Sequence, residues 1–408
     1  MLPRAAVLPP SRPTAGVPRV ALDPFDEAFL ADPYQAQGQL RDAGPVFWLD
    51  ACGVYGMARH EDVAAALMDW QTYSSGRGVG LSDFATDPPW RPASLLLETD
   101  PPDHKMARDI VNRIVSMAAL KQIRPLWRAR AEELADDLVR RRRFDAVRDL
   151  AEVYPLRVFP DTIGLPQQGR EHLLPYAAAV FNAYGPRNAV FESTEAALPA
   201  ANAWVADACR RSNLSEEGWG MDVFRAADDG KCTEEQAERL VRSFISAGVD
   251  TTVSGLGNMM LAFATFPDQW RRLRAEPGLT KRAFEESLRW DSAVQIFFRT
   301  TTRAVDIKGA TIPEGAKVLL FLAAANRDPR RWDDPERFDI GRIASGHVGF
   351  GFGIHQCLGQ MVARQEAEMV LEALIPRIAQ IRLVGPPVRR LNNSLHALAS
   401  LPVEIDPA

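Results

Sequence analysis

Apolar residues recur at helical spacing along most of the chain. Seven segments carry this pattern and are predicted to be helical: residues 61–73, 125–143, 193–211, 233–266, 267–277, 279–290 and 359–379. Strand-like runs are short and occupy residues 44–50, 53–58, 303–322 and 401–406. Strands and helices do not alternate as they do in a parallel sheet. The pattern predicts a mainly α-helical body with small β-sheets, as one domain over residues 21–408 after a proline-rich tail at 1–20.

Composition and charge narrow the classes of function. The 408 residues carry a formal net charge of -5, so the charge balance does not favour nucleic acid as a partner. The first 20 residues lack a long apolar run, and the least charged stretch, residues 251–267, is interrupted by polar residues. Neither a signal peptide nor a membrane span is therefore predicted. The four cysteines lie far apart without metal-cluster spacing, which favours a reducing, cytoplasmic location.

One cysteine has an unusual setting. Residues 350–360 read FGFGIHQCLGQ, and glycines surround Cys357 on both sides. A buried structural thiol needs no such glycines, and a nucleophile needs a base, whereas the side chain of His355 is expected to point away from Cys357. A thiolate metal ligand explains more, because glycines let the backbone approach a flat cofactor and the following helix directs its positive end at the sulfur. A single cysteine thiolate is an established ligand of haem iron.

Five positions of this stretch resemble the haem-binding loop of cytochromes P450, whose spacing is F-x-x-G-x-H-x-C-x-G. They are Phe350, Gly353, His355, Cys357 and Gly359. The resemblance implies the cytochrome P450 fold, with haem b held between a long oxygen-binding helix and the helix after Cys357, and Cys357 as the axial ligand of the iron.

Three further stretches resemble the same family and follow in the same order. EESLR resembles its E-x-x-R motif, in which Glu286 and Arg289 share one helix face; an ordinary surface pair is the alternative. AANRDP at 324–329 resembles the stretch that comes next. DDPERFD resembles the segment after that, and this implies that Arg337 completes the charge network of Glu286 and Arg289.

The two haem propionates need cations, because a buried unpaired carboxylate is costly. The resemblance assigns this role to four residues, each of which has a surface salt bridge or a satisfied loop position as its alternative. They are His104, Arg108, Arg299 and His355.

The stretch SAGVDTTVSG, residues 246–255, clusters poor helix formers inside the longest predicted helix. Threonines bend helices by bonding to the carbonyl of the preceding turn, so a local distortion is expected. The stretch resembles the oxygen-binding kink of cytochromes P450, which implies that Asp250 relays protons and that the Thr251 hydroxyl bonds to dioxygen. An acid and an alcohol side by side favour a monooxygenase that uses O2 over a sensor.

Electrons are predicted to come from separate proteins. The two glycine-rich spots, GRGVG and GFGFG, do not fit a dinucleotide-binding turn. By analogy with the family, the partners are a [2Fe-2S] ferredoxin and an NAD(P)H-dependent ferredoxin reductase. Arg113, Arg342 and Arg364 are candidate docking contacts near Cys357.

From about Ala21 onward the sequence resembles bacterial cytochromes P450 that oxidise para-substituted benzoates, such as 4-methoxybenzoate O-demethylases. The stretches that carry this resemblance include SSGRGVGLSDF, PWRPASLLLETDPP, LVRSFISAGVDTT and VQIFFRTTTR. The resemblance implies a small aromatic carboxylate as substrate. The carboxylate anchors would be Arg91, Ser94, Ser243 and Ser246, with Arg242 close by. Ser243 and Ser246 share one helix face, although helix serines bonded to their own carbonyls are the alternative.

The apolar walls of that pocket correspond to Leu97, Phe181, Val294 and Phe297. Three positions depart from close relatives: Tyr184 replaces phenylalanine, Ile296 replaces threonine and Ala293 replaces proline. A phenol at Tyr184 near the para end would bond a substrate hydroxyl, so hydroxylation of a 4-hydroxy- or 4-alkylbenzoate is the alternative to O-demethylation. A cytochrome P450 for an unrelated apolar substrate, a haem-thiolate sensor and a cysteine hydrolase are more distant alternatives.

Overall fold

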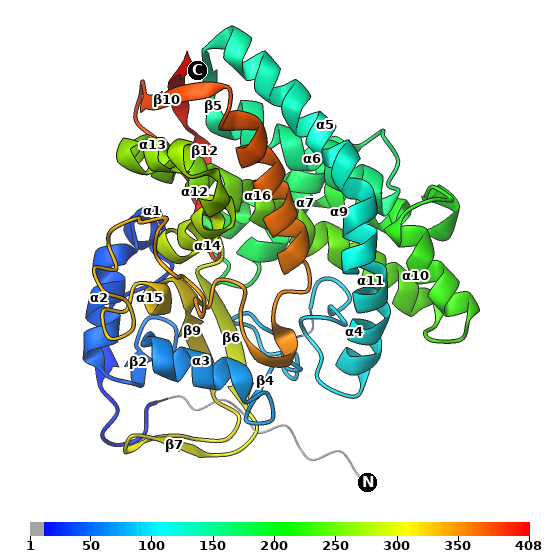
Figure 1. Ribbon diagram of the computed structural model, residues 1–408. Helices are drawn as coiled ribbons and strands as arrows, with labels where there is room; N and C mark the ends of the chain where they lie inside the picture. The colour runs from blue at the N-terminus through cyan, green and yellow to red at the C-terminus, as the bar shows by residue number, and fades with distance from the viewer. Residues whose placement is uncertain (1–11, 88) are drawn as a thin grey trace.

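The computed structural model describes residues 12–87 and 89–408. Figure 1 shows helices over most of the molecule and the strands of one sheet gathered below them. Residues 1–11 of the predicted tail lie outside the described residues, and Arg19–Val20 already form strand β1. The sheet therefore begins just before the predicted domain boundary at Ala21.

Helices account for the main body, as predicted. The α-helices are α1 Glu27–Ala31, α2 Tyr34–Ala43, α3 His60–Met68, α4 Asp103–Ile114, α5 Met117–Arg141, α6 Val153–Ile163, α7 Leu173–Asn182, α8 Ala189–Glu195, α9 Leu198–Ala208, α10 Trp219–Asp228, α11 Glu234–Gly248, α12 Asp250–Thr265, α13 Pro267–Ala275, α14 Thr280–Trp290, α15 Leu322–Asn326 and α16 Gln360–Leu374. Single turns of other helix types are η1 Ala146–Ala151, η2 Arg170–His172, η3 Arg211–Asn213, η4 Pro277–Leu279 and η5 Gly353–His355.

The largest sheet contains six strands in the order β1-β2-β3-β9-β6-β4. In it, β1 runs parallel to β2 and β3 runs parallel to β9, while the other neighbours are antiparallel. The strands of this sheet and of the smaller sheets are, in chain order, β1 Arg19–Val20, β2 Phe47–Leu49, β3 Val54–Met57, β4 Tyr73–Ser74, β5 Arg143–Asp145, β6 Ile296–Thr301, β7 Val305–Ile307, β8 Ala310–Ile312, β9 Lys317–Phe321, β10 Ile378–Leu383, β11 Val388–Arg390, β12 Ala397–Ser400 and β13 Pro402–Pro407.

The longest predicted helix, residues 233–266, is interrupted where its poor helix formers lie. It consists of α11 and α12, which meet at Val249. The Thr251 hydroxyl donates to the Ala247 carbonyl (2.7 Å), and the Thr252 hydroxyl donates to the Gly248 carbonyl (3.3 Å). These bonds replace regular helix bonds across the junction. The expected distortion is therefore confirmed.

Proline explains two further departures from the predicted helices. The predicted helix at 193–211 is divided into α8 and α9, and Pro199 lies in the first turn of α9, where its missing N–H costs nothing. The predicted helix at 359–379 ends at Leu374, because Pro376 cannot continue it, and strand β10 follows.

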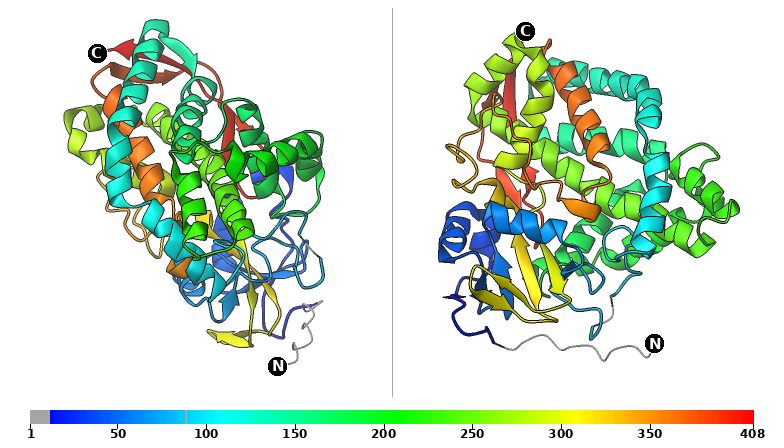
Figure 2. Two further views of the ribbon diagram at one scale, coloured as in Figure 1. Left: turned by 90° about the vertical axis from the view of Figure 1, so that its right-hand side faces the viewer. Right: turned by 60° about the horizontal axis from the view of Figure 1, so that its bottom comes forward.

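Helix α12 lies at the centre of the largest core and is buried along most of its length. It packs against α14, η1 and β12, and α16 packs against α5 and α14. Both views in Figure 2 show α16 beside α5. These contacts fix the positions of α12 and α16, the two helices that flank the candidate site. Among the described residues, no helix is long and apolar enough to cross a membrane.

Candidate active site

One cavity brings most of the predicted site residues together. Its walls come from α7, α11, α12, β6, the loop at 91–97 and the loop before α16. The predicted haem and proton-transfer residues that line it are Arg108, Thr251, Arg299, Phe350, His355, Cys357 and Gly359. The predicted substrate residues that line it are Arg91, Ser94, Leu97, Phe181, Tyr184, Ser243, Ser246, Val294 and Phe297. The remaining predicted residues of the site, His104, Arg242, Asp250 and Gly353, are not among the residues that line it.

A tight backbone turn holds Cys357 in the cavity wall. The Cys357 N–H donates to the Phe350 carbonyl (2.7 Å), and α16 begins three residues later. Burial raises the pKa of the Cys357 thiol, whereas the Gly359 N–H and the charges of Arg108 and Arg364 lower it. A metal ion bound to the sulfur would remove the burial penalty, because a coordinated thiol is deprotonated.

The glycines of this loop have separate roles. Gly353 has a φ of +71°, and a Cβ there would lie 2.6 Å from the Leu67 carbonyl oxygen of α3. Gly353 therefore lets the loop pack on α3 and is not among the residues that line the cavity, so its predicted approach to the cofactor stays a prediction. Gly359 lines the cavity, and within the described chain nothing lies within 4 Å of the position that its Cβ would take. That open space agrees with a cofactor beside Gly359.

Two arginines enter the cavity without a carboxylate partner in the described part of the chain. Arg299 is buried in β6 and donates to the Phe298 carbonyl (2.7 Å), and burial lowers its pKa to about 10. Arg108 projects from α4, and burial lowers its pKa as well. Two such cations beside one cavity predict an anionic ligand there, because buried charges are normally paired.

The two histidines behave differently from each other. His355 lies between the Leu96 carbonyl (3.2 Å) and the Asp100 carboxylate (3.2 Å), so both of its ring nitrogens already have protein acceptors. The ring of His104 packs edge-on against it, with centroids 4.4 Å apart. His104 Nε2 is buried and has no hydrogen-bond partner among the described residues, and burial lowers the pKa of His104 to about 4. His104 thus keeps a free ring nitrogen for a ligand, whereas His355 does not.

These features fit haem. The Cys357 sulfur would bind the haem iron, and Arg108, Arg299 and His104 would provide the charges and the polar nitrogen that pair with the two propionates. The cavity contains about 1650 Å³ without protein atoms, its open mouth included. His355 would act mainly by orienting His104 and Asp100.

Asp250 and Thr251 differ in their access to the cavity. Thr251 lines the cavity, and its hydroxyl donates to the Ala247 carbonyl. Asp250 is completely buried and forms an ion pair with Arg390 of β11. The other oxygen of Asp250, Oδ2, has no partner among the described residues. The acid and the alcohol are adjacent in sequence, but only the alcohol reaches the cavity.

Arg91 is held in a buried ion pair that the sequence did not indicate. Its Nη1 and Nη2 donate to the two carboxylate oxygens of Glu98 (3.0 and 3.1 Å), and Nη2 also donates to the Tyr184 hydroxyl (3.3 Å). Burial opposes the charge of Arg91, but Glu98 raises its pKa above the ordinary value. The phenol of Tyr184 is thus engaged by Arg91. Its hydroxyl only accepts this bond and keeps its own proton, so the predicted bond to a substrate hydroxyl stays a prediction.

The three serines meet the cavity with different hydrogen bonds. The Ser243 and Ser246 hydroxyls donate to the carbonyls one turn earlier, at Arg239 (2.9 Å) and Arg242 (2.8 Å). This is the helix-serine alternative to anchoring. Ser94 Oγ accepts from two backbone N–H groups and lies 3.3 Å from Ser243 Oγ. The Ser94 proton is consequently available to Ser243 or to a ligand.

Aromatic rings form the apolar wall. The Tyr184 ring meets Phe181 and Phe297 edge-on, with centroids 5.6 and 5.8 Å apart. Among the departures from close relatives, Ala293 lines the cavity, whereas Ile296 packs into the core on the other side of the sheet. Arg242 does not reach the cavity surface, and its Nε is buried without a partner in the described chain.

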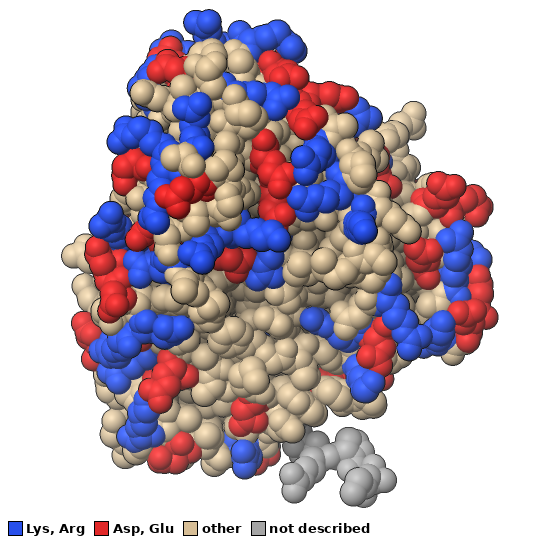
Figure 3. Space-filling model, viewed as in Figure 1, with Lys and Arg blue, Asp and Glu red and all other residues tan. Residues whose placement is uncertain are grey.

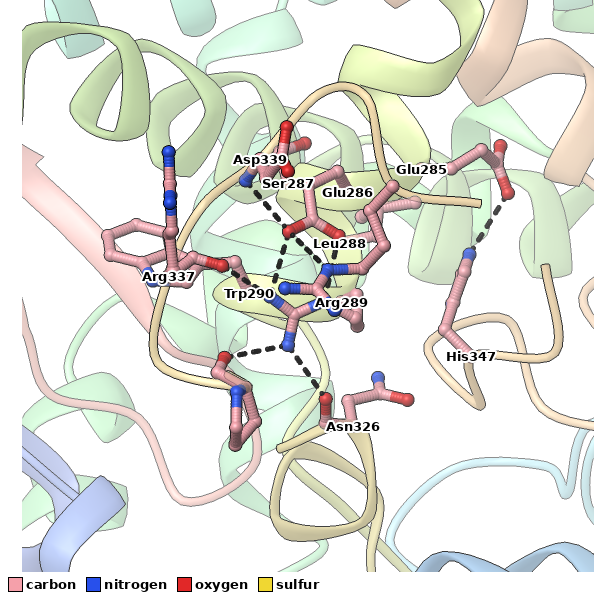
Figure 4. A network of polar contacts seen from close by, with 12 residues as sticks. Glu285, Glu286, Ser287, Leu288, Arg289, Trp290, Asn326, Arg337, Asp339 and His347 are labelled. Atoms are coloured by element: carbon pink, nitrogen blue, oxygen red, sulfur yellow. Dashed lines mark hydrogen bonds and ion pairs between the residues drawn. The ribbon is translucent and has the colours of Figure 1, made fainter. Parts of the chain in front are cut away.

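The predicted charge network joins α14 to the segment at 335–342, which precedes the Cys357 loop. Glu286 and Arg289 are both fully buried and pair through two bonds of 2.7 and 2.8 Å. Arg289 also donates to the Arg337 carbonyl (2.9 Å), but Figure 4 shows the exposed Arg337 side chain directed away from the pair. The prediction that the Arg337 charge completes the network is therefore wrong. The second cation is Arg342, whose Nε donates to Glu286 (3.2 Å).

Several lining residues carry no sequence signal that distinguishes them from ordinary core. Phe159 of α6, Trp219 of α10 and Phe244 of α11 line the cavity, and Trp219 contacts both rings with centroids 6.2 Å away. Glu98 was also missed, although its position in PWRPASLLLETDPP, seven residues after Arg91, allows an ion pair. These residues come together only through the tertiary fold.

Comparison with known proteins gives consistent matches. A sequence model of the family described as Cytochrome P450 matches residues 210–379. The chain is 52% identical over 403 residues to cytochrome p450 CYP199A2 from Rhodopseudomonas palustris, covering 98% of both chains. It is 31% identical to the vitamin D(3) 25-hydroxylase of Pseudonocardia autotrophica, covering 94% of this chain and 96% of the relative. The solved structure of cytochrome P450 CREJ in complex with (4-ethylphenyl) dihydrogen phosphate superposes with a TM-score of 0.84 at 26% identity, covering 94% of this chain and 99% of the other.

Proposed function

Because the chain belongs to the cytochrome P450 family and is a haem-b monooxygenase, we propose that it oxidises a para-substituted benzoate, by O-demethylation of 4-methoxybenzoate. The observation that carries the proposal is one cavity lined both by Cys357 and by a polar set of Arg91 and three serines. The sequence resemblance to benzoate-oxidising cytochromes P450 supports it. So does the CREJ complex, whose ligand is a para-substituted ring with an anionic group.

When bound, haem b supplies an iron centre that activates dioxygen and inserts one oxygen atom into a C–H bond. Oxidation of the methoxy carbon gives a hemiacetal, which releases formaldehyde and leaves 4-hydroxybenzoate. The other oxygen atom leaves as water and consumes two electrons and two protons. The protein residues bind the cofactor, orient the substrate and deliver the protons.

Substrate orientation is assigned to the carboxylate anchors. Ser94 donates most readily, because its oxygen already accepts from the backbone and its proton is free to turn to a carboxylate. Ser243 and Ser246 must rotate their protons away from helix carbonyls before they donate. Arg91 adds a positive charge, and its hydrogen bonds to Glu98 fix the orientation of its guanidinium group. With the carboxylate held, the para substituent alone reaches the reacting centre.

Proton delivery is assigned to Thr251 and Asp250. Thr251 lies in the cavity wall, and its hydroxyl, which donates to the Ala247 carbonyl, is of a type that can both donate and accept. Asp250 would supply protons to Thr251 from the side away from the cavity. Before it can do so, its ion pair with Arg390 must open, or a water must bridge Asp250 and Thr251. Arg390 is about one-third exposed, so it links the buried carboxylate to solvent.

We assign electron delivery to a [2Fe-2S] ferredoxin and its NAD(P)H-dependent reductase. The docking face is taken to be the surface over the Cys357 loop. Figure 3 shows a broad uncharged area at the centre of the view, where Figure 1 shows the loop before α16. Met68 and Met361, which adjoin that loop, are 59% and 38% exposed. Arg342 and Arg364 are engaged by Glu286 and Glu285, so apolar contact is expected to contribute more than these two predicted charges.

The test is an optical titration of the purified haem protein with 4-methoxybenzoate. A shift of the Soret band from low to high spin is expected, followed by formaldehyde and 4-hydroxybenzoate when the reduced partner proteins are supplied. A thiolate-haem spectrum that does not respond to any para-substituted benzoate would refute the substrate. Binding of 4-ethylbenzoate with a hydroxylated product, and no product from the methyl ether, would establish the alternative reaction.

A further inference from the structure

A buried lysine lies beneath the loop GRGVG, which the assigned function leaves unexplained. Lys317 begins β9, and 4% of its surface is exposed. Its Nζ donates to three backbone carbonyls, those of Arg77 (3.0 Å), Gly78 (3.1 Å) and Gly80 (3.1 Å). All three ammonium protons therefore have an acceptor within one short loop.

The loop at 76–81 contacts the substrate cavity on two sides. The Val79 carbonyl accepts from the Phe298 N–H (2.9 Å), between Phe297 and Arg299 of β6. The Leu81 N–H donates to the Tyr184 carbonyl (2.8 Å) at the end of α7. A Cβ at Gly80 would lie 2.8 Å from Tyr184 Cα, so only glycine permits this approach. Any movement of the loop would thus displace the aromatic wall of the cavity.

The arrangement is that of a cation site. Within the described chain, no carboxylate lies within 4 Å of Lys317 Nζ, so main-chain oxygens alone solvate the charge. Rings of backbone carbonyls replace the hydration shell of monovalent cations in the same way. At longer range, Asp83 and Glu98 favour the charged form and Arg77 and Arg299 oppose it. Burial lowers the pKa of Lys317 to about 7.

We propose that Lys317 is a positioning residue, whose ammonium fills a monovalent-cation site built from the carbonyls of Arg77, Gly78 and Gly80 and thereby fixes Tyr184 in the substrate cavity. The substrate part of this inference rests on the proposed function, whereas the cation site itself does not. In the wild type the site is permanently filled, so added cations have no effect. Removal of the side chain should open it to a free cation.

The experiment compares Lys317→Ala with Lys317→Met. Benzoate affinity, from the Soret titration, and melting temperature are measured in sodium, potassium, ammonium and tetramethylammonium chloride at constant ionic strength. Both variants lose the three hydrogen bonds of the Lys317 ammonium. In tetramethylammonium we therefore expect them to bind benzoate about tenfold more weakly than the wild type. Ammonium or potassium should restore affinity and melting temperature in Lys317→Ala. Neither should help Lys317→Met, because its side chain still occupies the space.

Lys281→Ala, at a largely exposed lysine, is the matched control and should show no cation specificity. If Lys317→Ala shows the same melting temperature and affinity in all four salts, the cation site is refuted. If no benzoate binds to the wild type, the proposed function fails, but the melting temperatures still decide the cation site.

Discussion

Neutralising Glu98 should destabilise the free protein while it tightens benzoate binding. Glu98 is almost fully buried and accepts three hydrogen bonds, two from Arg91 and one from the Ser94 N–H (2.7 Å). In Glu98→Gln the amide keeps one acceptor but places an NH2 group against donors. Arg91 is then left as a buried cation without a counter-charge until a carboxylate substrate arrives.

The size of the effect follows from this geometry. Two unit charges about 4 Å apart interact by about 4 kcal/mol at an effective dielectric of about 20. Breaking a buried pair by removing one partner costs about 3–5 kcal/mol. Because glutamine retains a hydrogen bond, we expect a loss of about 3 kcal/mol in the free energy of unfolding, at the lower end of that range. If the substrate carboxylate restores half of this, affinity rises by about tenfold.

The assay is denaturant unfolding of the haem protein with and without 4-methoxybenzoate, together with the Soret titration. The neutral isostere 4-methoxybenzamide is the ligand control, and its affinity should not rise in Glu98→Gln. If the variant binds benzoate no more tightly than the wild type, or if the amide gains as much as the acid, Arg91 does not act as a charge for the substrate. An unchanged free energy of unfolding would refute the buried ion pair.

Three further substitutions test the charged contacts of α14. Glu286→Gln should cost about 3–5 kcal/mol in the free energy of unfolding, because it leaves the fully buried Arg289 without its counter-charge. Arg337→Ala should stay within about 0.5 kcal/mol, since only its carbonyl takes part; urea unfolding of both variants decides. Burial raises the pKa of Glu285, but hydrogen bonds from His347 and Arg364 lower it to about 2 from an ordinary 4.5. Its stabilisation is therefore present above pH 4.5 and lost as the pH falls towards 2, and Glu285→Gln should show a smaller loss of stability over that range.

The pattern of apolar positions predicted the helical body well where helices carry one apolar face. It missed α4 and α7, among others. Helix α7 is apolar almost throughout, so helical periodicity gives no contrast in it, and its neighbours α9 and α11 bury it from several sides. The break at Val249 was predictable because threonine has a local reason to bond to helix carbonyls. Strand β6 was not identified as a strand, since its alternation is hidden by burial on both faces.

For the site, the residue types were easier to predict than their contacts. Cys357 was singled out by its glycine-rich setting and by family resemblance, and Arg108 and Arg299 were predicted from the resemblance; all three line one cavity. The hydrogen bond between His355 and Asp100 and the ion pair between Arg91 and Glu98 could not be predicted from the sequence. Each depends on a loop whose backbone path is set by tertiary packing. The same holds for Arg342, which takes the place that was predicted for Arg337.

Strand β13, near the C-terminus, pairs with both β10 and β5, and β5 lies more than 250 residues earlier in the chain. During synthesis, Arg143–Asp145 must wait for the last residues to emerge, which at about 5–20 residues per second takes on the order of ten seconds or more. The Cys357 ligand also emerges late. The sheet formed by β10, β13 and β5 is therefore completed only after β13 has been synthesised, and Cys357 becomes available only after the central helices.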